Sequence, residues 1–176
     1  MAPALLTLTS TDDPFNYGDV AAEGALTEVF TVDNIGGSQA TGILYSITTT
    51  GGGFFNRIAG TCGATLTPTE PPCTIIVEYA PGVGTEGTVH DETYSLDYNN
   101  GAAADIITRG LRGNSVAPAN LVLISGAPNF GNRPTGSSID EVYVIENQGD
   151  VDANLIAEIA PILGAGFNYT LSLIHI

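Results

Sequence analysis

The stretch Glu28-Val-Phe-Thr-Val-Asp-Asn-Ile-Gly36 recurs 113 positions later, without a gap, as Glu141-Val-Tyr-Val-Ile-Glu-Asn-Gln-Gly149. In the first stretch Phe30 and Val32 alternate with Thr31 and Asp33, which is the period of a β-strand with one buried face. Each stretch ends in Asn-x-Gly, where asparagine tolerates a left-handed backbone and bonds back to the main chain. We therefore predict a strand ending in a turn, present twice. The turn residues are Asn34, Gly36, Asn147 and Gly149.

The repeat extends on both sides of this stretch. The same shift aligns Asn16-Tyr17-Gly18 with Asn129-Phe130-Gly131, and a two-residue slip aligns Pro3–Leu6 with Pro118–Leu121. Self-similarity at a fixed period indicates a repeated structural module. We expect a complete module in residues 1–117 and the N-terminal part of a second copy in residues 118–170.

The C-terminal part of the chain needs separate treatment. Residues 151–163 have helical propensity, but the partner of 155–163 in the first copy is the threonine-rich stretch 42–50, so the repeat predicts a strand there. The last six residues, 171–176, resemble the translation of a transposase adapter used in shotgun sequencing libraries. Our hypothesis is that they are read-through, and we exclude them from the fold prediction.

Composition independently favours β structure. The 22 glycines and 10 prolines are spread along the chain, and the short segments between them are rich in Thr, Val, Ile, Leu and Tyr. This pattern is typical of a sandwich of short strands. The residues predicted to form the core are Leu6, Leu8, Tyr17, Phe30, Val32, Ile43, Phe54, Ile75, Val77, Tyr79, Tyr94, Leu96 and Leu111.

Two strand predictions are specific enough to be tested. Residues 73–79 alternate, and Ile76 is an apolar residue on the otherwise polar side, which suggests a sheet edge or a partner contact. Asn99-Asn100-Gly101 lies between two strand-like runs and predicts a hairpin with a type I′ turn. We expect its second strand to contain Leu111 and to end at Gly113.

The charge of the chain excludes one class of function. Nineteen acidic residues accompany four arginines and no lysine, giving a formal charge of -15. Nucleic-acid binding requires a basic surface that replaces counterions, so we expect no nucleic-acid partner. No apolar run approaches the roughly 18 residues of a membrane helix, and the first residues lack the pattern of a secretory signal. We expect no membrane insertion in this segment.

The order of several motifs resembles a known family. The motifs are Tyr17-Gly18-x-Val, Asn34-x-Gly36, Thr61-Cys62-Gly63, Cys73-x-Ile-x-Val, a tyrosine followed by Pro81, and Leu111-x-Gly113. This set resembles the immunoglobulin-like repeats of bacterial choice-of-anchor D surface proteins, which are related to the abnormal-spindle and hydin domains of cilia and centrosomes. Tyr17 replaces the phenylalanine usual in the family, which the second copy supplies as Phe130. The resemblance covers residues 3–117 fully and 118–170 in part.

The resemblance implies an all-β, tandem immunoglobulin-like sandwich with the second copy truncated. It implies a non-catalytic module of a large exported bacterial surface protein, used for spacing, display or adhesion. The expected partners are neighbouring repeats of the same chain, with a protein or glycan ligand that the sequence does not identify. It also implies a disulfide between Cys62 and Cys73, which agrees with an even cysteine count and an oxidising compartment. Pro81 suits a strand end, where its missing N–H is tolerated.

Two alternative functions remain open. One is a cytosolic protein-interaction domain of the cilium or centrosome type, which reduced cysteines would favour. The other is an accessory domain of a secreted hydrolase, with sugar binding as its role. That function requires an exposed aromatic platform, whereas most tyrosines and phenylalanines fall on predicted core faces.

Two motifs could suggest enzymatic chemistry. Residues 82–87 match Gly-x-Gly-x-x-Gly, but a strand-like acidic segment follows them in place of the helix that a dinucleotide site requires. His90 precedes Asp91 and Glu92, yet neighbouring residues on a strand point to opposite faces, so we expect a solvent-facing histidine and no catalytic residue.

Calcium is the one ligand that the acidic residues suggest. Pairs of carboxylates could supply oxygen ligands if loops brought them together. None of these pairs follows an established calcium-loop pattern, so we predict no cofactor and interpret the acids as a solvated coat that discourages strand pairing. The candidate groups are Asp12 with Asp13, Asp91 with Glu92 and Asp97, and Asp150 with Asp152.

Overall fold

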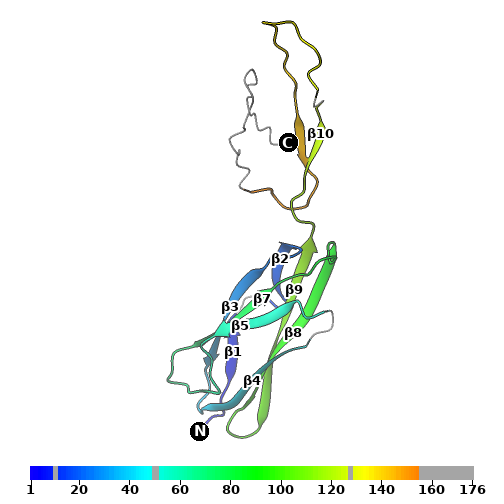
Figure 1. Ribbon diagram of the computed structural model, residues 1–176. Helices are drawn as coiled ribbons and strands as arrows, with labels where there is room; N and C mark the ends of the chain where they lie inside the picture. The colour runs from blue at the N-terminus through cyan, green and yellow to red at the C-terminus, as the bar shows by residue number, and fades with distance from the viewer. Residues whose placement is uncertain (10–11, 49–51, 127–128, 155–176) are drawn as a thin grey trace.

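The computed structural model describes residues 1–9, 12–48, 52–126 and 129–154, whose regular structure is all β-strand (Figure 1). The second copy contributes a hairpin of β10 (Leu121–Ser125) and β11 (Val144–Asn147). The strands of the first module are β1 (Leu6–Thr9), β2 (Phe15–Ala21), β3 (Leu26–Asn34), β4 (Ala40–Thr48), β5 (Phe55–Gly60), β6 (Thr65–Leu66), β7 (Cys73–Tyr79), β8 (Thr88–Asn99) and β9 (Ala104–Val116).

The strands of the first module form two sheets. Their orders are β1-β3-β7-β5 and β2-β9-β8-β4-β6, and all neighbours are antiparallel except β2 and β9. In the lettering of immunoglobulin domains, the first sheet is A-B-E-D, and β4, β8 and β9 are strands C, F and G. The prediction of an all-β, immunoglobulin-like sandwich is confirmed.

The core lies between the two sheets and is built from alternate residues of each strand. In β7, residues 73, 75, 77 and 79 are buried and those between them are half-buried, as the alternation predicted. The predicted core residues are all buried except Leu8 and Phe54, which pack against the core while partly exposed. Burial of these side chains is the main stabilising contribution to such a fold.

The structure corrects the sequence analysis at two apolar positions. Phe55, and not Phe54, is the fully buried residue of β5, because it pairs with Tyr79 in the sheet while Phe54 lies in the loop before it. Ile76 lies on β7, which has β3 on one side and β5 on the other. The expectation of a sheet edge at Ile76 is therefore wrong, and its side chain is half-buried on the outer face.

The β8–β9 hairpin is confirmed, but its turn differs from the prediction. Asn99 pairs with Ala104, so the loop has four residues, 100–103. The Asn100 side-chain oxygen accepts the N–H groups of Ala102 and Ala103 at 2.9 Å each, while Gly101 supplies a φ of 90°. An asparagine side chain thus closes a wider turn than the predicted type I′ turn. Strand β9 also continues past Gly113 to Val116.

The chain enters and leaves the sandwich at opposite ends. Figure 1 shows the N-terminus at one pole and the end of β9 at the other, where the chain continues directly into β10. Strand β9 has 13 residues, so at roughly 3.3 Å per residue it extends about 40 Å. We call these ends the entry pole and the exit pole.

Two predictions fall on residues outside the described ranges. The strand expected at 155–163 and the proposed read-through at 171–176 both belong to them. Within the part of the chain that is described, there is no helix long and apolar enough to cross a membrane.

Candidate functional site

The Asn-x-Gly turn at the entry pole is held by a single buried side chain. The side-chain oxygen of Asn34 accepts the N–H groups of Leu5 (3.2 Å) and Gly36 (3.1 Å). Its amide nitrogen donates to the carbonyls of Ser38 (2.9 Å) and Leu66 (2.8 Å). Asn34 is only 2% exposed, so these four bonds satisfy groups that water does not reach freely.

Gly36 is required for a different reason, which is space. A Cβ atom at Gly36 would overlap the carbonyl oxygen of Pro3 and the backbone of Leu5. The segment that leads into β1 therefore lies directly on the turn, and only glycine permits this approach.

The second copy forms the same turn with three of the four bonds. The Asn147 oxygen accepts the N–H groups of Asn120 (2.9 Å) and Gly149 (3.1 Å), and its amide donates to Val151 O (2.8 Å). A Cβ atom at Gly149 would likewise overlap the carbonyl group of Pro118. Asn147 itself is exposed.

The glycines of the opening motif also match between the copies. Gly18 and Gly131 have φ angles of 72° and 66°. The N–H of Gly18 donates to the side chain of Asn16 at 2.9 Å, and that of Gly131 donates to Asn129 at 2.8 Å. The Asn-x-Gly spacing thus builds one local structure in both copies.

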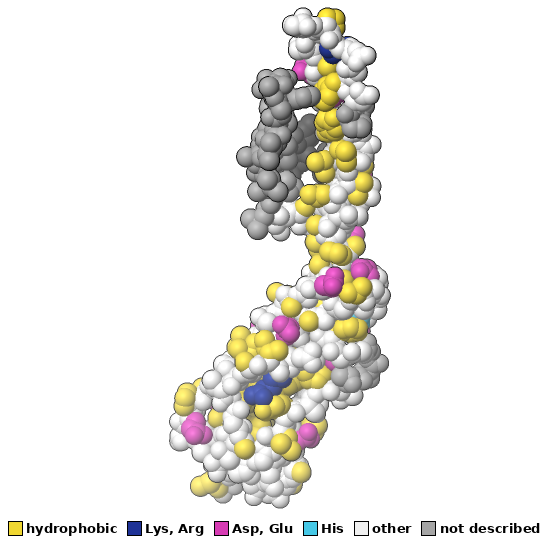
Figure 2. Space-filling model, in the orientation of Figure 1, with side chains coloured by type: hydrophobic (Ala, Val, Ile, Leu, Met, Phe, Trp, Pro, Cys, Tyr) yellow, Lys and Arg dark blue, Asp and Glu magenta, His cyan; other side chains and the backbone are white. Residues whose placement is uncertain are grey.

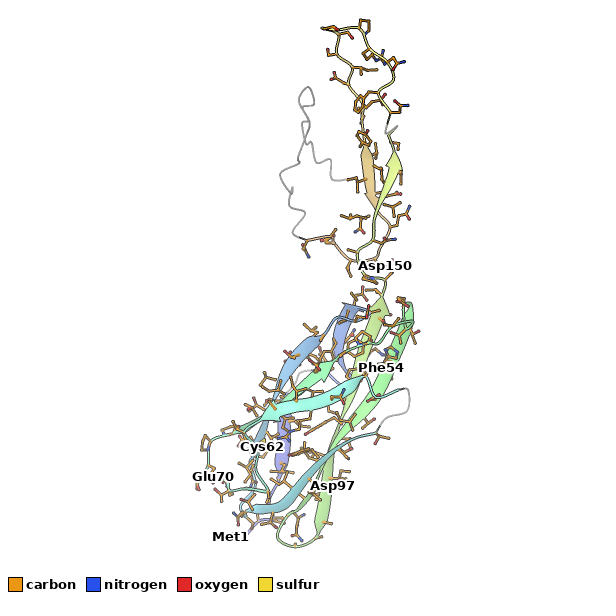
Figure 3. All side chains as sticks on the ribbon, in the orientation of Figure 1. Met1, Phe54, Cys62, Glu70, Asp97 and Asp150 are labelled. Atoms are coloured by element: carbon orange, nitrogen blue, oxygen red, sulfur yellow. A yellow bond between two sulfur atoms is a disulfide. The ribbon has the colours of Figure 1, made fainter. Side chains whose placement is uncertain are left out.

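The joint between the first module and the second copy is short and hydrogen-bonded. The N–H of Ala117 donates to Asp150 Oδ2 at 2.9 Å, and the N–H of Asp150 donates to Ala117 O at 3.1 Å. Figure 3 shows Asp150 at the exit pole, far from Met1 at the entry pole. Asp150, which the sequence analysis treated only as a candidate calcium ligand, is a contact residue of this joint.

The predicted disulfide is present, between Cys62 and Cys73, with the Cα atoms 4.9 Å apart. It closes the loop between β5 and β7. This loop carries β6 across to pair with β4 of the opposite sheet, and Leu66 of β6 is buried. The bridge therefore fixes the base of a connection between the two sheets.

Two of the remaining motif residues, Tyr17 and Gly113, lie against Tyr79. The hydroxyl of Tyr17 donates to Val77 O at 3.0 Å, and its ring lies against Tyr79 with centroids 5.8 Å apart. A Cβ at Gly113 would overlap the Tyr79 ring, so this glycine makes room for the aromatic core. Leu111 and Pro81 are also buried, and Pro81 follows the end of β7 as predicted.

A buried polar group on β8 was missed by the sequence analysis. His90 is 5% exposed, so the expectation of a solvent-facing histidine is wrong. Its Nδ1 lies 2.8 Å from the hydroxyl of Tyr79, and its ring packs on Phe54 with centroids 4.1 Å apart. Burial lowers the pKa of His90 below its usual range. The missed signal was the alternation of His90 with Tyr94 and Leu96, which puts all three on the inner face.

Glu92 lies on the same inner face and is also 5% exposed. Its Oε1 accepts the N–H of Gly53 at 3.2 Å, while Oε2 has no hydrogen-bond partner among the described residues. Burial raises the pKa of this carboxyl, and the backbone N–H groups of Gly53 and Phe54 partly offset that rise.

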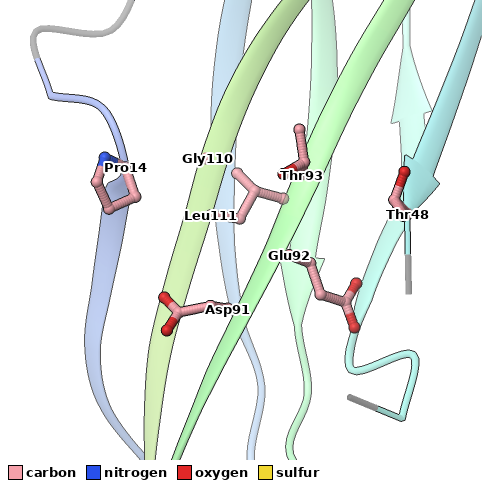
Figure 4. A pocket seen from close by; sticks show the side chains of 7 residues that line it. All are labelled: Pro14, Thr48, Asp91, Glu92, Thr93, Gly110 and Leu111. Carbon is pink, nitrogen blue, oxygen red and sulfur yellow. The ribbon is translucent and has the colours of Figure 1, made fainter. Parts of the chain in front are cut away.

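Asp91 points away from this group. Figure 4 shows Asp91 and Glu92 on opposite sides of β8, at a shallow hollow of about 340 Å³ that Pro14, Thr48, Thr93 and Gly110 also line. Asp91 accepts two hydrogen bonds from Arg112, of 2.6 and 3.0 Å, and this hydrogen bonding holds the pKa of Asp91 below its usual range. His90, Asp91 and Glu92 therefore do not assemble as an acid–base unit.

The other acidic residues are dispersed. Figure 2 shows acidic side chains scattered over the visible face of the sandwich. The Asp13 carboxylate accepts the N–H of Gly110 at 2.8 Å, and Asp97 is exposed on the outer face of β8. Across residues 1–9, 12–48, 52–126 and 129–154, no three His, Cys, Asp or Glu side chains gather as a metal site.

The Gly-x-Gly-x-x-Gly match at residues 82–87 forms turns between β7 and β8. Gly84 and Gly87 have φ angles of 76° and 75°, and the Thr85 hydroxyl donates to Gly82 O at 2.7 Å. The residues that follow form β8. This agrees with the interpretation of the motif as a glycine-rich turn.

Comparison with known proteins gives structural likeness only. No protein-family model matches the chain, and no curated protein matches it. Similar solved structures include VesC, a secreted serine protease from Vibrio cholerae, at 15% identity and a TM-score of 0.45, covering 64% of this chain and 24% of VesC. The ASH/PapD-like domain of human CEP192 is 8% identical, with a TM-score of 0.41. The match covers 64% of this chain and 86% of the CEP192 domain.

The SrpA adhesin from Streptococcus sanguinis is 13% identical with a TM-score of 0.39, covering 64% of this chain and 57% of SrpA. The chain spans about a quarter of VesC, the first of these structures. By its own sheet order, the chain belongs to the class of immunoglobulin-like β-sandwich proteins.

Proposed function

We propose that this chain is part of an exported bacterial surface protein in which each sandwich acts as a non-catalytic structural spacer. The observation that carries this proposal is the position of the two poles. The chain enters at one end and leaves at the other through a hydrogen-bonded joint, so successive modules extend the molecule instead of folding back (Figure 1). The choice-of-anchor D family remains part of this proposal, on the motifs given above.

The disulfide supports export over the cytosolic alternative. A bond between Cys62 and Cys73 persists in an oxidising compartment and is rare in the cytosol. Free, alkylatable thiols in protein taken from its native source would contradict export and favour the cytosolic protein-interaction domain.

The exposed ring of Tyr45 does not favour the sugar-binding alternative. Tyr45 on β4 is 39% exposed, but the guanidinium of Arg57 covers its ring at 3.6 Å from the centroid. A sugar that stacked on this ring would first have to displace the cation–π contact. The buried His90, bonded to Tyr79, likewise supports a structural role over a catalytic one.

Small-angle X-ray scattering of the oxidised chain tests the spacer function. A compact chain of 176 residues would have a radius of gyration of about 16 Å. We expect a clearly larger value and a distance distribution with a long tail, because the second copy extends from the exit pole. A compact particle of about 16 Å would overturn the proposal.

A further inference from the structure

Asp150 contacts Ala117, the residue that follows β9 and leads into the second copy, through both backbone groups of Ala117. The two bonds are Ala117 N–H to Asp150 Oδ2 (2.9 Å) and Asp150 N–H to Ala117 O (3.1 Å). The preceding residue, Val116, is itself fixed to the sandwich, because its carbonyl accepts the N–H of Ala22 at 2.9 Å. Asp150 therefore bonds to the residue next to Val116, which is itself hydrogen-bonded to the sandwich.

The covalent chain at this joint is also stiff. Pro118 has a fixed φ and restricts Ala117 to an extended conformation. Gly149 lies so close to Pro118 that a Cβ would overlap its carbonyl group. With Asp150 in place, few free rotations remain between the end of β9 and the start of β10.

The first copy holds its incoming chain at the same place with a different side chain. The Ser38 hydroxyl donates to Ala2 O at 2.7 Å, and the N–H of Gly37 donates to Pro3 O at 3.1 Å. Ala2-Pro3 corresponds to Ala117-Pro118 in the repeat, and Gly37 corresponds to Asp150. A side chain just after the Asn-x-Gly turn thus holds the residue before the proline in both copies.

We propose that Asp150 is the positioning residue that sets the direction of the second copy relative to the first module, by holding the linker residue Ala117 against the Asn147-x-Gly149 turn. This inference rests on the proposed spacer function. The carboxylate accepts an N–H that would otherwise bond only to water, so its loss frees rotation about the joint.

The test compares Asp150→Ala with Asp150→Asn, which keeps an acceptor oxygen, and with Asp152→Ala, which removes an exposed carboxylate two residues away. Amide exchange of Ala117 and residual dipolar couplings of β10 and β11 are measured in the full chain. In Asp150→Ala we expect Ala117 to exchange about tenfold faster, the effect of losing one hydrogen bond to a charged group. We also expect the hairpin couplings to stop fitting the alignment tensor of the sandwich.

Asp150→Asn and Asp152→Ala are expected to behave as the unmodified chain. Hairpin couplings that still fit one tensor with the sandwich in Asp150→Ala would overturn the inference. If scattering still shows an extended particle in that case, the spacer function is supported and only the role of Asp150 is contradicted. A compact unmodified chain would contradict both the spacer function and the role of Asp150.

Discussion

Asn34 satisfies four backbone groups from one buried position, and those groups belong to three different segments: the lead into β1, the turn itself and β6. A buried polar group left without its partner costs about 1–3 kcal/mol. Asn34 therefore stabilises the fold mainly by providing hydrogen-bond partners for buried backbone groups that would otherwise have none.

We predict that Asn34→Ala lowers the free energy of unfolding by about 2–3 kcal/mol, because several buried backbone groups lose their partner together. Urea denaturation followed by tyrosine fluorescence measures this. The matched control is Asn147→Ala, which removes the same turn bonds at an exposed position and should cost less than about 1 kcal/mol. Equal losses in the two variants would show that burial of Asn34 is not the reason.

Glu92 and His90 are buried ionisable groups whose pKa shifts act on stability in opposite directions. The pKa of Glu92 is raised, so the folded state binds its proton more tightly, and stability falls as pH rises above the usual glutamate range. The pKa of His90 is lowered, so the unfolded state takes up the proton first, and stability falls as pH drops below the usual histidine range. Both effects follow from burial on the inner face of β8.

We predict that Glu92→Gln raises the free energy of unfolding by about 1 kcal/mol at pH 7, because it keeps the oxygen bonded to Gly53 and removes a buried charge. The gain should shrink as pH approaches the ordinary glutamate pKa, where the carboxyl becomes neutral in both states. Denaturation at pH 7 and pH 4 measures it, with the exposed Asp97→Asn as control. A gain that is the same at both pH values would rule out the burial of charge as its cause.

We predict that the pKa of His90 in the folded protein lies below the normal histidine range. Burial disfavours the imidazolium, and the Tyr79 hydroxyl is hydrogen-bonded to Nδ1. NMR titration of the ring protons measures this directly. Tyr79→Phe keeps the packing but removes the hydroxyl, and it provides the comparison. A normal pKa would mean that the ring is solvated in solution.

Among the elements, β6 has the least support of its own. It has two residues and pairs with β4 at the edge of its sheet. Its position depends on the disulfide at the base of its loop and on the bond from Asn34 to Leu66 O. A two-residue strand cannot hold itself in place, so these links decide whether it forms.

We predict that replacing both cysteines by alanine lowers the free energy of unfolding by about 3 kcal/mol, because the short loop regains its freedom in the unfolded state. Amide exchange at Thr65 and Leu66 should accelerate more than exchange in β7, since β6 loses its local support. Thermal melts with and without reductant give an independent measurement. Identical melting under both conditions would contradict a stabilising role for the bridge.

At the scale of the whole molecule, the two copies differ in what their strands can pack against. In the first module, β3 lies between β1 and β7, and its apolar residues reach the core. The described strands of the second copy form a two-stranded sheet. Its exposed apolar side chains include Leu121, Leu123, Val144 and Ile145. A two-stranded sheet alone is marginally stable in water.

We predict that amides of β10 and β11 exchange at least a hundredfold faster than those of β3, β7 and β8, because local opening of a two-stranded hairpin needs far less free energy than global unfolding. Hydrogen exchange by NMR on the intact chain measures this. The short edge strand β1 serves as an internal reference within the closed sandwich. Equal protection of both copies would show that the second copy is packed by some other route.

Local sequence patterns predicted much of the structure that neighbours along the chain make. Alternation predicted the inner face of β7, and Asn-x-Gly predicted the turns at Asn34 and Asn147. The turn at Asn100 is also local, but its type was predicted wrongly because the Asn100 side chain closes a loop of four residues. Phe54 was placed in the core wrongly for a different reason, because pairing of Phe55 with the distant Tyr79 fixes the start of β5.

The sequence by itself determined the all-β class, the repeat and the pair of cysteines, because strand period, turn chemistry and composition are local properties. The tertiary structure alone decided that β6 crosses between sheets and that Asp150 joins the second copy to Ala117. Each of these depends on which strands lie opposite one another. That arrangement is set by burial of the whole core, and no single segment encodes it.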